Sequence, residues 1–558
     1  MSRRLIFTNQ ANQYDSGNYT YGAGVGARSR FVRSVLKRKA TKTQAPPIYD
    51  LIHYLVKKGF SIIPEKSNAG LERVSISDDG GRVALLLLET PNIVTKSVLI
   101  FDYRTPTASE WTTVLIAKGD DVNKTYGVAD AHDKKYWVQV GNAIQGDSSI
   151  SLGMQGIELS GDGNNIILAS PSGEGGGTGL IECYELNGGT WSNMNTQIEG
   201  VDFNTSIFCI SGANNRDRIV VGYSAEFYDS ANVPNGESLS DYGENGAVMA
   251  YELRHVTQSE WEALPAVNRV QKGNSSGDSW SAVSDPSDST RSEKKWFISD
   301  FSKPIIPKAL LSTGLTFGYS LSITEDGYFI AVGSLLCTRD SSDDTKLVSS
   351  SNEGVVQLYR SPNHPDSSSS DACELLHTFT IGDLLGNSAS SIPSSQLGIN
   401  VGISPDGKSL ALVCSNIIMT SGTVNPAGMV FLVNINSTST SSISFEAARV
   451  TAGTVQGNEG DRFGFPGCLS FSKNNLLVIS SYALSNGYVN LYHKEGNSWS
   501  MKKQLVLGER ILASTISKDG SAVIIGDDTT EYISDSVNYT DAGSGRIYLI
   551  ESEVKERV

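Results

Sequence analysis

The chain has 558 residues, of which 39% are hydrophobic and 55 are glycine, so it can bury a core while spending much of its length on turns, which favours an all-β protein. Its net charge of −15 argues against nucleic-acid binding by the body of the chain. No stretch approaches the ~20 apolar residues of a transmembrane helix, and the basic start turns polar before a signal peptide can form, so we expect neither a membrane span nor secretion by a signal peptide.

The first 42 residues carry a charge opposite to that of the rest. They contain nine Arg or Lys residues and one acid, Asp15, which gives +8 and leaves −23 for residues 43–558. Residues 31–39 can form a short amphipathic helix with Phe31 among its apolar residues. We therefore predict an extended basic arm over residues 1–49, with partner-binding residues Arg28, Arg30, Phe31, Arg33, Lys37, Arg38 and Lys39.

Several uses of this arm stay open. A basic amphipathic segment docks on an acidic groove of a protein assembly, on nucleic acid or on an anionic membrane. The alternative is a solvated, disordered arm without a partner.

From residue 71 onward a turn with the pattern Ser-x-Asp-Gly returns between two strands. The aspartate can bond its own backbone and the glycine tolerates positive φ, as a tight hairpin requires. The copies lie at 77–80, 160–163, 324–327, 404–407 and 517–520, with a variant at 472–475 and a degenerate copy that begins at Ser211.

Each turn is followed by an apolar strand and then by a third strand rich in Val, Tyr and Leu. Runs that are apolar throughout are typical of strands buried on both faces. The third strand occurs seven times, at 98–103, 180–184, 247–251, 355–359, 429–433, 488–492 and 546–550. Seven copies of a unit that cannot bury its faces alone predict a closed ring, a seven-bladed β-propeller over residues 50–558.

Two further features recur within the copies. A large apolar residue followed by glycine opens several of them, where the glycine lets the backbone pass close to a neighbouring blade; these pairs are 152–153, 317–318, 397–398 and 463–464. Tryptophan follows the third strand in four copies, which predicts an outer fourth strand near Trp111, Trp191, Trp261 and Trp499.

The last copy ends within eight residues of its third strand, which leaves little room for an outer strand. We therefore predict that the N-terminal side closes the ring, with a strand near residues 59–64. The excess length of the copies falls in polar loops, where a rigid scaffold usually carries recognition; these are 225–246, 263–312, 338–352 and 361–372.

Together, the opening Phe-Gly, the Ser-x-Asp-Gly hairpin and the third strand before a tryptophan resemble FG-GAP-like and WD-like propeller repeats over roughly residues 71–551. The Asp-x-Asp-x-Asp-Gly loops that bind calcium in integrin-type repeats are missing, so the resemblance implies no calcium. Residues 21–40 resemble the tails that precede similar propellers in large DNA viruses infecting protists, which implies a virion component.

The sequence offers no convincing catalytic or metal site. The six histidines lack metal-binding spacing, the six cysteines form no Cys-x-x-Cys pair, and we expect the cysteines to be reduced, buried thiols. Residues 402–409 match a P-loop by letter but coincide with a repeat turn, and 273–277 match Gly-x-Ser-x-Gly inside a polar loop. The recurring aspartates fit a hairpin requirement better than an acid/base pair, because a single active site would not repeat.

These observations predict a non-enzymatic structural or binding scaffold without cofactor, metal ion or identified small-molecule substrate. Its expected partners are proteins of an assembly, in a virion its capsid proteins, and its expected location is the virion or the cytoplasm. The alternative is a propeller glycoside hydrolase or a sugar-binding lectin that acts through its loops.

Overall fold

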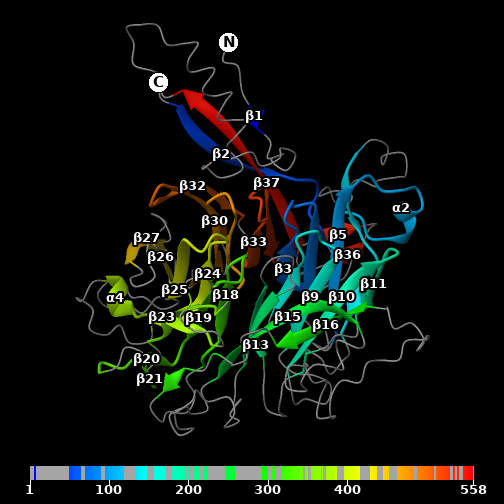
Figure 1. Ribbon diagram of the computed structural model, residues 1–558. Coiled ribbons are helices and arrows are strands. Elements are labelled where there is room, and N and C mark those ends of the chain that lie inside the picture. Colours follow the sequence, from blue (N-terminus) through cyan, green and yellow to red (C-terminus); the bar gives the residue numbers. More distant parts are fainter. Residues whose placement is uncertain are drawn as a thin grey trace.

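The computed structural model is a seven-bladed β-propeller, in which seven antiparallel sheets of four or five strands surround a central axis (Figure 1). The predicted fold class is thereby confirmed. The structure describes residues 6–7, 49–63, 69–89, 95–117, 134–146, 156–170, 179–194, 198–199, 207–212, 218–223, 246–257, 292–298, 305, 307–309, 316–342, 346–349, 353–362, 364–365, 367, 372–385, 395–414, 428–436, 444–451, 462–482, 487–507, 510–527, 532–534, 537–539 and 544–556.

Blades 1 to 4 follow one another along the chain, each running from an inner strand to an outer one. Blade 1 contains β3 (Ala69–Ile76), β4 (Arg82–Glu89), β5 (Thr95–Arg104), β6 (Tyr136–Gln139) and β7 (Ile144–Gln145). Blade 2 contains β8 (Gly156–Leu159), β9 (Asn165–Ser170), β10 (Leu180–Asn187), β11 (Thr190–Asn193) and β12 (Ile198–Glu199). Blade 3 contains β13 (Ile207–Gly212), β14 (Arg218–Tyr223), β15 (Ala247–Thr257) and β16 (Ser292–Ile298). Blade 4 contains β18 (Ser320–Ile323), β19 (Phe329–Ser334), β22 (Val355–Arg360) and β23 (Glu374–Phe379).

Blades 5 to 7 complete the ring. Blade 5 contains β24 (Leu397–Ile403), β25 (Ser409–Cys414), β26 (Met429–Asn436) and β27 (Ser444–Thr451). Blade 6 contains β28 (Arg462–Phe463), β29 (Leu469–Phe471), β30 (Leu476–Tyr482), β31 (Tyr488–Glu495) and β32 (Ser498–Val506). Blade 7 contains β33 (Ile511–Ile516), β34 (Ala522–Asp527), β37 (Ser544–Glu556), β2 (Tyr49–Lys57) and β1 (Ile6–Phe7). All seven predicted third strands are thus confirmed.

In the part of the chain that the structure describes, two small sheets and two short helices lie outside the blades. The sheets are β17 (Lys308–Ala309) with β21 (Lys346–Ser349) and β20 (Cys337–Arg339), and β35 (Tyr532–Ser534) with β36 (Val537–Tyr539). The helices are α2 (Glu110–Thr113) and α4 (Ile381–Leu385). A search of the described residues for a helix with the length and apolar character of a membrane span gives none.

The repeated turn has the chemistry that its sequence predicts. In blade 7, Ser517 Oγ donates to Asp519 Oδ1 at 2.7 Å, and the same carboxylate accepts the backbone N–H of Ser521 at 2.8 Å. The glycine of the five full copies has φ between 66° and 74°. This is the left-handed region, which glycine adopts at little conformational cost. The P-loop match at 402–409 is one of these turns, because Ser404 Oγ donates to Asp406 Oδ1 at 2.6 Å.

The hydrophobic core lies between the blades rather than within each one. One cluster joins Leu358 of blade 4 to Leu412 and Phe431 of blade 5, all fully buried. Close approach between blades depends on the predicted glycines, since the Cα of Gly333 lies 3.0 Å from where a Cβ on Gly398 would stand. Each blade therefore completes its core with its neighbours.

One predicted outer strand is wrong in blade 1. Trp191 and Trp499 lie in the outer strands β11 and β32, but Trp111 lies in helix α2. Its indole is buried against Tyr136 of β6, the strand that forms the outer edge of the blade, with ring centroids 5.3 Å apart. Trp261 lies outside the described residues.

The N-terminal side closes the ring, but through β2 rather than through residues 59–64. Strand β2 pairs with β37 over nine positions, from Tyr49 opposite Glu556 to Lys57 opposite Tyr548. Of residues 59–63, the part of the predicted segment that the structure describes, only Ile62 makes a bridge, to Gly545. Ile62 and Ile63 are buried, so the apolar run that indicated an edge strand is instead part of the core.

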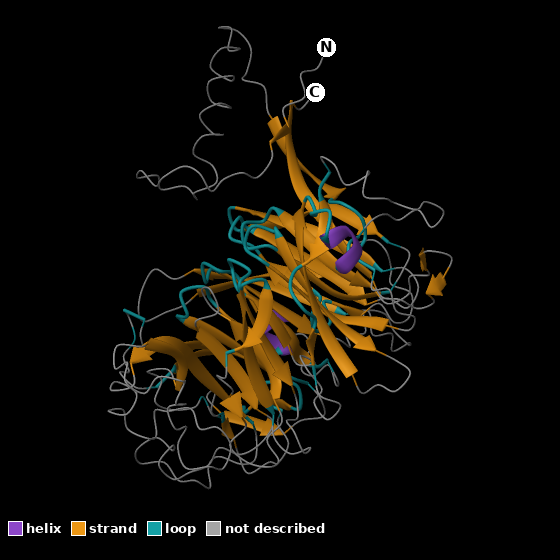
Figure 2. Ribbon diagram, turned by 90° about the vertical axis from the view of Figure 1, so that its right-hand side faces the viewer, coloured by secondary structure: helices purple, strands orange, loops and turns teal. Residues whose placement is uncertain are grey.

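The β2–β37 pair extends beyond the ring as a projecting ribbon. Strand β37 pairs with β34 only up to Leu549, while β2 follows it to Glu556. Beyond β34, β1 occupies the other side of β37, with Ile6 opposite Glu553. Figures 1 and 2 show this ribbon leaving the ring.

Candidate functional site

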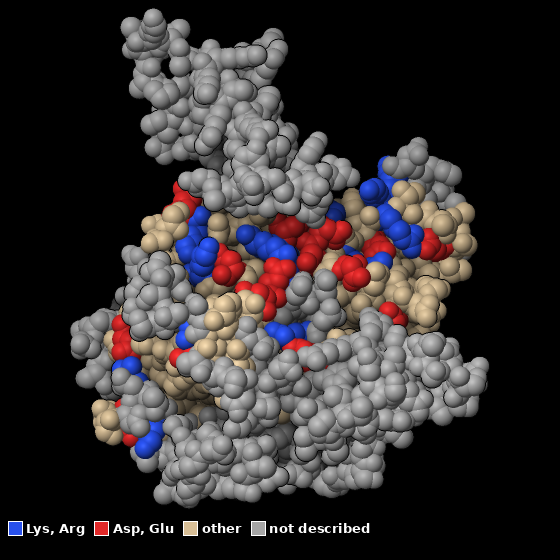
Figure 3. Space-filling view, viewed as in Figure 1, with Lys and Arg blue, Asp and Glu red and all other residues tan. Residues whose placement is uncertain are grey.

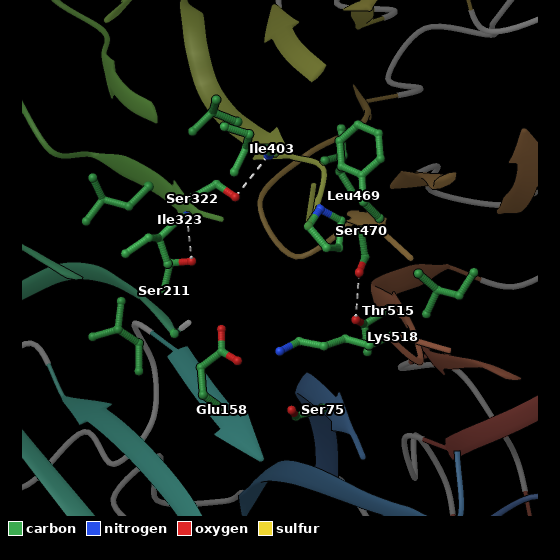
Figure 4. A pocket seen from close by; sticks show the side chains of 18 of the residues that line it. Ser75, Glu158, Ser211, Ser322, Ile323, Ile403, Leu469, Ser470, Thr515 and Lys518 are labelled. Atoms are coloured by element: carbon green, nitrogen blue, oxygen red, sulfur yellow. Dashed lines mark hydrogen bonds between the residues drawn. The ribbon is translucent and has the colours of Figure 1, made fainter. Parts of the chain in front are cut away.

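The central channel is lined by the same position of each inner strand. In the six copies with a clear turn, this position lies two residues before the first residue of the turn; in blade 3 it is Ser211, which lies in strand β13 and not, as predicted, at the start of a turn. The residues at this position surround a cavity of about 240 Å³ (Figure 4). The seven residues are Ser75, Glu158, Ser211, Ser322, Gly402, Ser470 and Thr515. Six of them are small or hydroxyl-bearing, so Glu158 is the exception.

The channel hydroxyls connect adjacent blades. Ser75 Oγ accepts the backbone N–H of Leu159 in the next blade at 2.9 Å, and Ser322 Oγ accepts that of Ile403 at 3.0 Å. Similar bonds join blades 3 and 4 through Ser211 and blades 6 and 7 through Thr515. These hydroxyls therefore have a structural role, because each satisfies a polar group at a blade junction.

The turns also bond to one another around the mouth of the channel. The backbone N–H of Asp78 donates to Gly161 O at 3.0 Å, that of Asp519 donates to Asp78 O at 3.0 Å, and that of Lys473 donates to Lys518 O at 2.7 Å. The inward-facing ends of the blades are consequently fixed relative to each other. We call this ring of turns the turn rim.

Charged side chains lie at the turn rim. Lys473 Nζ of blade 6 lies 2.6 Å from Glu325 Oε1 of blade 4, so the ion pair passes the turn of blade 5. Figure 4 shows Lys518 and Glu158 pointing toward one another across the channel. On this face, basic and acidic side chains are interspersed rather than segregated (Figure 3).

A second cavity of about 280 Å³ lies at the other end of the channel and contains Arg73, Phe208 and Tyr319. Arg73 Nη1 donates to Pro466 O at 3.2 Å, which joins blade 1 to blade 6. The rings of Phe208 and Tyr319 lie 5.7 Å apart, and burial raises the pKa of the Tyr319 hydroxyl. The channel thus offers polar contacts from several blades at both ends.

The aspartates of the turns are used by the turns themselves. Asp79, Asp162, Asp326, Asp406 and Asp519 each accept a hydroxyl and a backbone N–H within their own hairpin. No group of three His, Cys, Asp or Glu side chains suited to a metal ion occurs in the described part of the chain. The Gly-x-Ser-x-Gly match at 273–277 lies outside it.

All six cysteines are free thiols, of which four are buried and two partly buried. Burial raises the pKa of each of these thiols whose shift is resolved, to about 12 for Cys337 and to about 11 for Cys468. Because the thiolate is the reactive form, a raised pKa makes a thiol a poor nucleophile.

The predicted arm residues Arg28, Arg30, Phe31, Arg33, Lys37, Arg38 and Lys39 lie outside the described residues, so the structure does not place them. It does place both ends of the segment that contains them. Residues 8–48 leave from β1 and return at β2, and both strands pair with β37 on the projecting ribbon.

Glu158, Lys518 and Arg73 line the channel but are not predicted from the sequence as channel residues. A signal was available, since aligning the six copies that have a clear turn places Glu158 at a position that otherwise holds Ser, Thr or Gly. Arg73 lacks such a signal, because it bonds to a carbonyl far away in the sequence.

Solved structures match the chain at low sequence identity. The structure entitled "Structure of Dos1 propeller" is 8% identical, with 88% of this chain and 95% of that chain covered and a TM-score of 0.38. A chain of "Crystal Structure of Mitotic Checkpoint Complex" is 12% identical, with 91% and 97% covered and a TM-score of 0.39. No family model matches the sequence, and the search of curated proteins gives no significant match.

Proposed function

We propose that this protein is a non-enzymatic binding scaffold, in which the propeller is a rigid body and the basic arm docks on an acidic surface of a protein assembly. The observation that carries the proposal is the attachment of the arm. Strands β1 and β2 hold its two ends on β37, on the ribbon that projects beyond the ring (Figure 2).

The charge distribution supports this division of roles. Residues 1–42 carry +8, whereas the remaining residues carry −23. An acidic body repels acidic surfaces, while a basic segment held away from it attracts them. The same partner would therefore bind the arm and avoid the ring.

The finer proposal is that the assembly is a virion and that its capsid proteins are the partners. It rests on the resemblance of residues 21–40 to the tails that precede similar propellers in large DNA viruses of protists. The FG-GAP-like and WD-like character of the repeats belongs to the same proposal. In this role the protein is found in virions or, before assembly, in the cytoplasm.

Co-sedimentation with the native assembly tests the role of the arm. The test variant replaces Arg28, Arg30, Arg33 and Lys37 with Gln, which leaves β1 and β2 intact. The matched control replaces four exposed lysines of the propeller with Gln: Lys134, Lys135, Lys408 and Lys503. We expect the arm variant to bind the assembly at least about tenfold more weakly, because its substitutions remove the positive charges that complement the acidic surface. The control should bind as the wild type does.

Equal association of the two variants with the assembly would contradict anchoring by the arm. Turnover of a glycan panel that Glu158→Gln abolishes would contradict the non-enzymatic role, because Glu158 is the carboxylate that faces the channel between small residues. Saturable glycan binding without turnover, centred on the loops, would favour a lectin instead.

A further inference from the structure

Two histidines from distant parts of the sequence meet where β2 packs against blade 6. His53 lies in the middle of β2 and His493 lies in β31, and their ring centroids are 5.2 Å apart with an interplanar angle of 66°. Strand β2 also contacts β32, and Leu55 packs against the hydrophobic cluster between blades 6 and 7. The histidine pair is therefore part of the contact that holds the closing strand against the ring.

The surroundings of His53 suit a neutral ring. Its side chain is buried, with 5% of its surface exposed, and its Nδ1 shares a hydrogen bond with Ser552 Oγ at 2.8 Å. Its Nε2 is buried without a hydrogen-bond partner. Protonation would make both ring nitrogens donors and would leave a buried N–H on a cation unsatisfied, which is costly.

The charged groups near His53 come from each packed strand and offer it little compensation. On β31 these are His493 and Glu495, and on β32 it is Lys502. Glu495 is 60% exposed, accepts a hydrogen bond from Lys502 Nζ at 2.7 Å and lies 3.4 Å from His493 Nδ1, so it faces His493 more directly than His53. On β2 itself Lys57 shares the face of His53 by strand alternation, and on β37 Glu551 lies on the opposite face, opposite Tyr54.

We propose that His53 and His493 form an acid-sensitive latch, which holds β2 against blade 6 at neutral pH and loosens when the rings are protonated. The latch goes beyond the proposed binding role and holds whether or not the arm binds a protein assembly. In support, burial and the neighbouring His493 lower the pKa of His53 to about 4, and burial also lowers the pKa of His493.

The direction of the effect follows from the two states of β2. When β2 is detached, His53 lies in water and takes up a proton near its ordinary pKa of 6.5, whereas the attached ring resists protonation until about pH 4. Acid therefore stabilises the detached state across this window and has no effect through His53 above it. The equilibrium constant for detachment rises roughly 30-fold between pH 7.5 and pH 5.

Amide hydrogen exchange of the full-length protein tests the latch. The readout is the protection factor of residues 49–57, corrected for the intrinsic pH dependence of exchange, at pH 7.5 and pH 5. We expect it to fall roughly 30-fold in the wild type, while strands β4 and β9 keep their protection. In His53→Phe, which keeps an aromatic ring but cannot be protonated, we expect little change with pH.

His493→Phe provides a second variant and should reduce the response, because the neighbouring cation is removed. The matched control is His377→Phe on β23, a histidine that packs on Phe379 with centroids 4.5 Å apart, far from β2 in blade 4, and it should respond like the wild type. Three results would overturn the latch: constant protection of β2 in the wild type, an unchanged response in His53→Phe, or simultaneous loss of protection in every blade.

Discussion

In the repeated turn, the side chains of Ser517 and Asp519 accept hydrogen bonds from backbone N–H groups. The hydroxyl of Ser517 donates to Asp519 and accepts the backbone N–H of Ala522 at 2.9 Å. The sequence predicted the role of the aspartate and the glycine, because both are general properties of tight turns. The role of the serine depends on its hydrogen bond with the backbone N–H of Ala522, five residues further along the chain, which the spacing alone does not indicate.

Replacement of Gly80 by Ala should destabilise the protein more than replacement of Gly188. Both glycines have positive φ, 66° and 57°, so each substitution has a conformational cost of about 1–2 kcal/mol. A Cβ on Gly80 would also stand 2.6 Å from the Cβ of Ala522 in blade 7, whereas the space at Gly188 is open. We expect a total loss of about 3 kcal/mol or more for Gly80→Ala.

Denaturant unfolding of the two variants measures this difference. Equal shifts of the unfolding midpoint would mean that the turn of blade 1 is not held tightly against blade 7. The comparison therefore separates the conformational cost of a turn residue from the close packing at the turn rim.

The thiols should resist modification in the native state. Burial raises the pKa of Cys373 to about 12 and of Cys468 to about 11, so the thiolate fraction at pH 8 is very small. We expect slow labelling of all six thiols by a disulfide reagent at pH 8, and complete labelling in denaturant. Rapid reaction of one thiol in the folded protein would contradict this assignment.

At the scale of elements, β2 is the part of the fold that the sequence located least well. Residues 49–57 alternate without a strong apolar face, since His53 and Lys57 share a side with Leu55. Residues 59–64 look more like a strand because of Ile62 and Ile63, yet both side chains are buried, Ile62 in the cluster between blades 1 and 7. Closure by the N-terminal side followed from counting strands, whereas the register depends on partners far away in the sequence.

Truncation should distinguish the closing strand from the arm. Removal of residues 1–48 deletes the arm and β1 but leaves β2, so we expect nearly unchanged stability. Removal of residues 1–57 deletes nine ladder positions and the contacts of Leu55, and we expect the melting temperature to fall by about 5 °C or more. Differential scanning calorimetry makes the measurement, and equal melting of the two truncated proteins would argue against closure by β2.

At the scale of the whole molecule, the blades are coupled because neighbouring blades share their cores. The number of blades and their order could be predicted, since each copy carries the same turn and the same third strand. The channel lining could be predicted only in part, because the aligned position is visible but the contacts of Arg73 are not. The loops of variable length and the arm carry no repeat, so the sequence gives their composition and no geometry.

Because the blades are coupled, a destabilising substitution in one blade should lower the unfolding midpoint of distant blades as well. Leu412 in blade 5 is fully buried, and Leu412→Ala should cost about 2–5 kcal/mol. We expect the midpoint reported by tryptophan fluorescence, to which Trp111, Trp137 and Trp191 of blades 1 and 2 contribute, to shift as far as the midpoint reported by circular dichroism. A shift in circular dichroism alone would show that the blades unfold independently.

The projecting ribbon also determines how the molecule responds to mechanical force. The arm joins β2 at Tyr49, at the tip, while β37 enters the ribbon from the ring at its opposite end. Tension between arm and ring therefore runs along β2, which continues into the ring at Lys58, and it loads the nine positions paired with β37 parallel to the strands. A tether of this geometry resists pulling far better than a ladder opened from one end, so the arm can bear load while the ring stays intact.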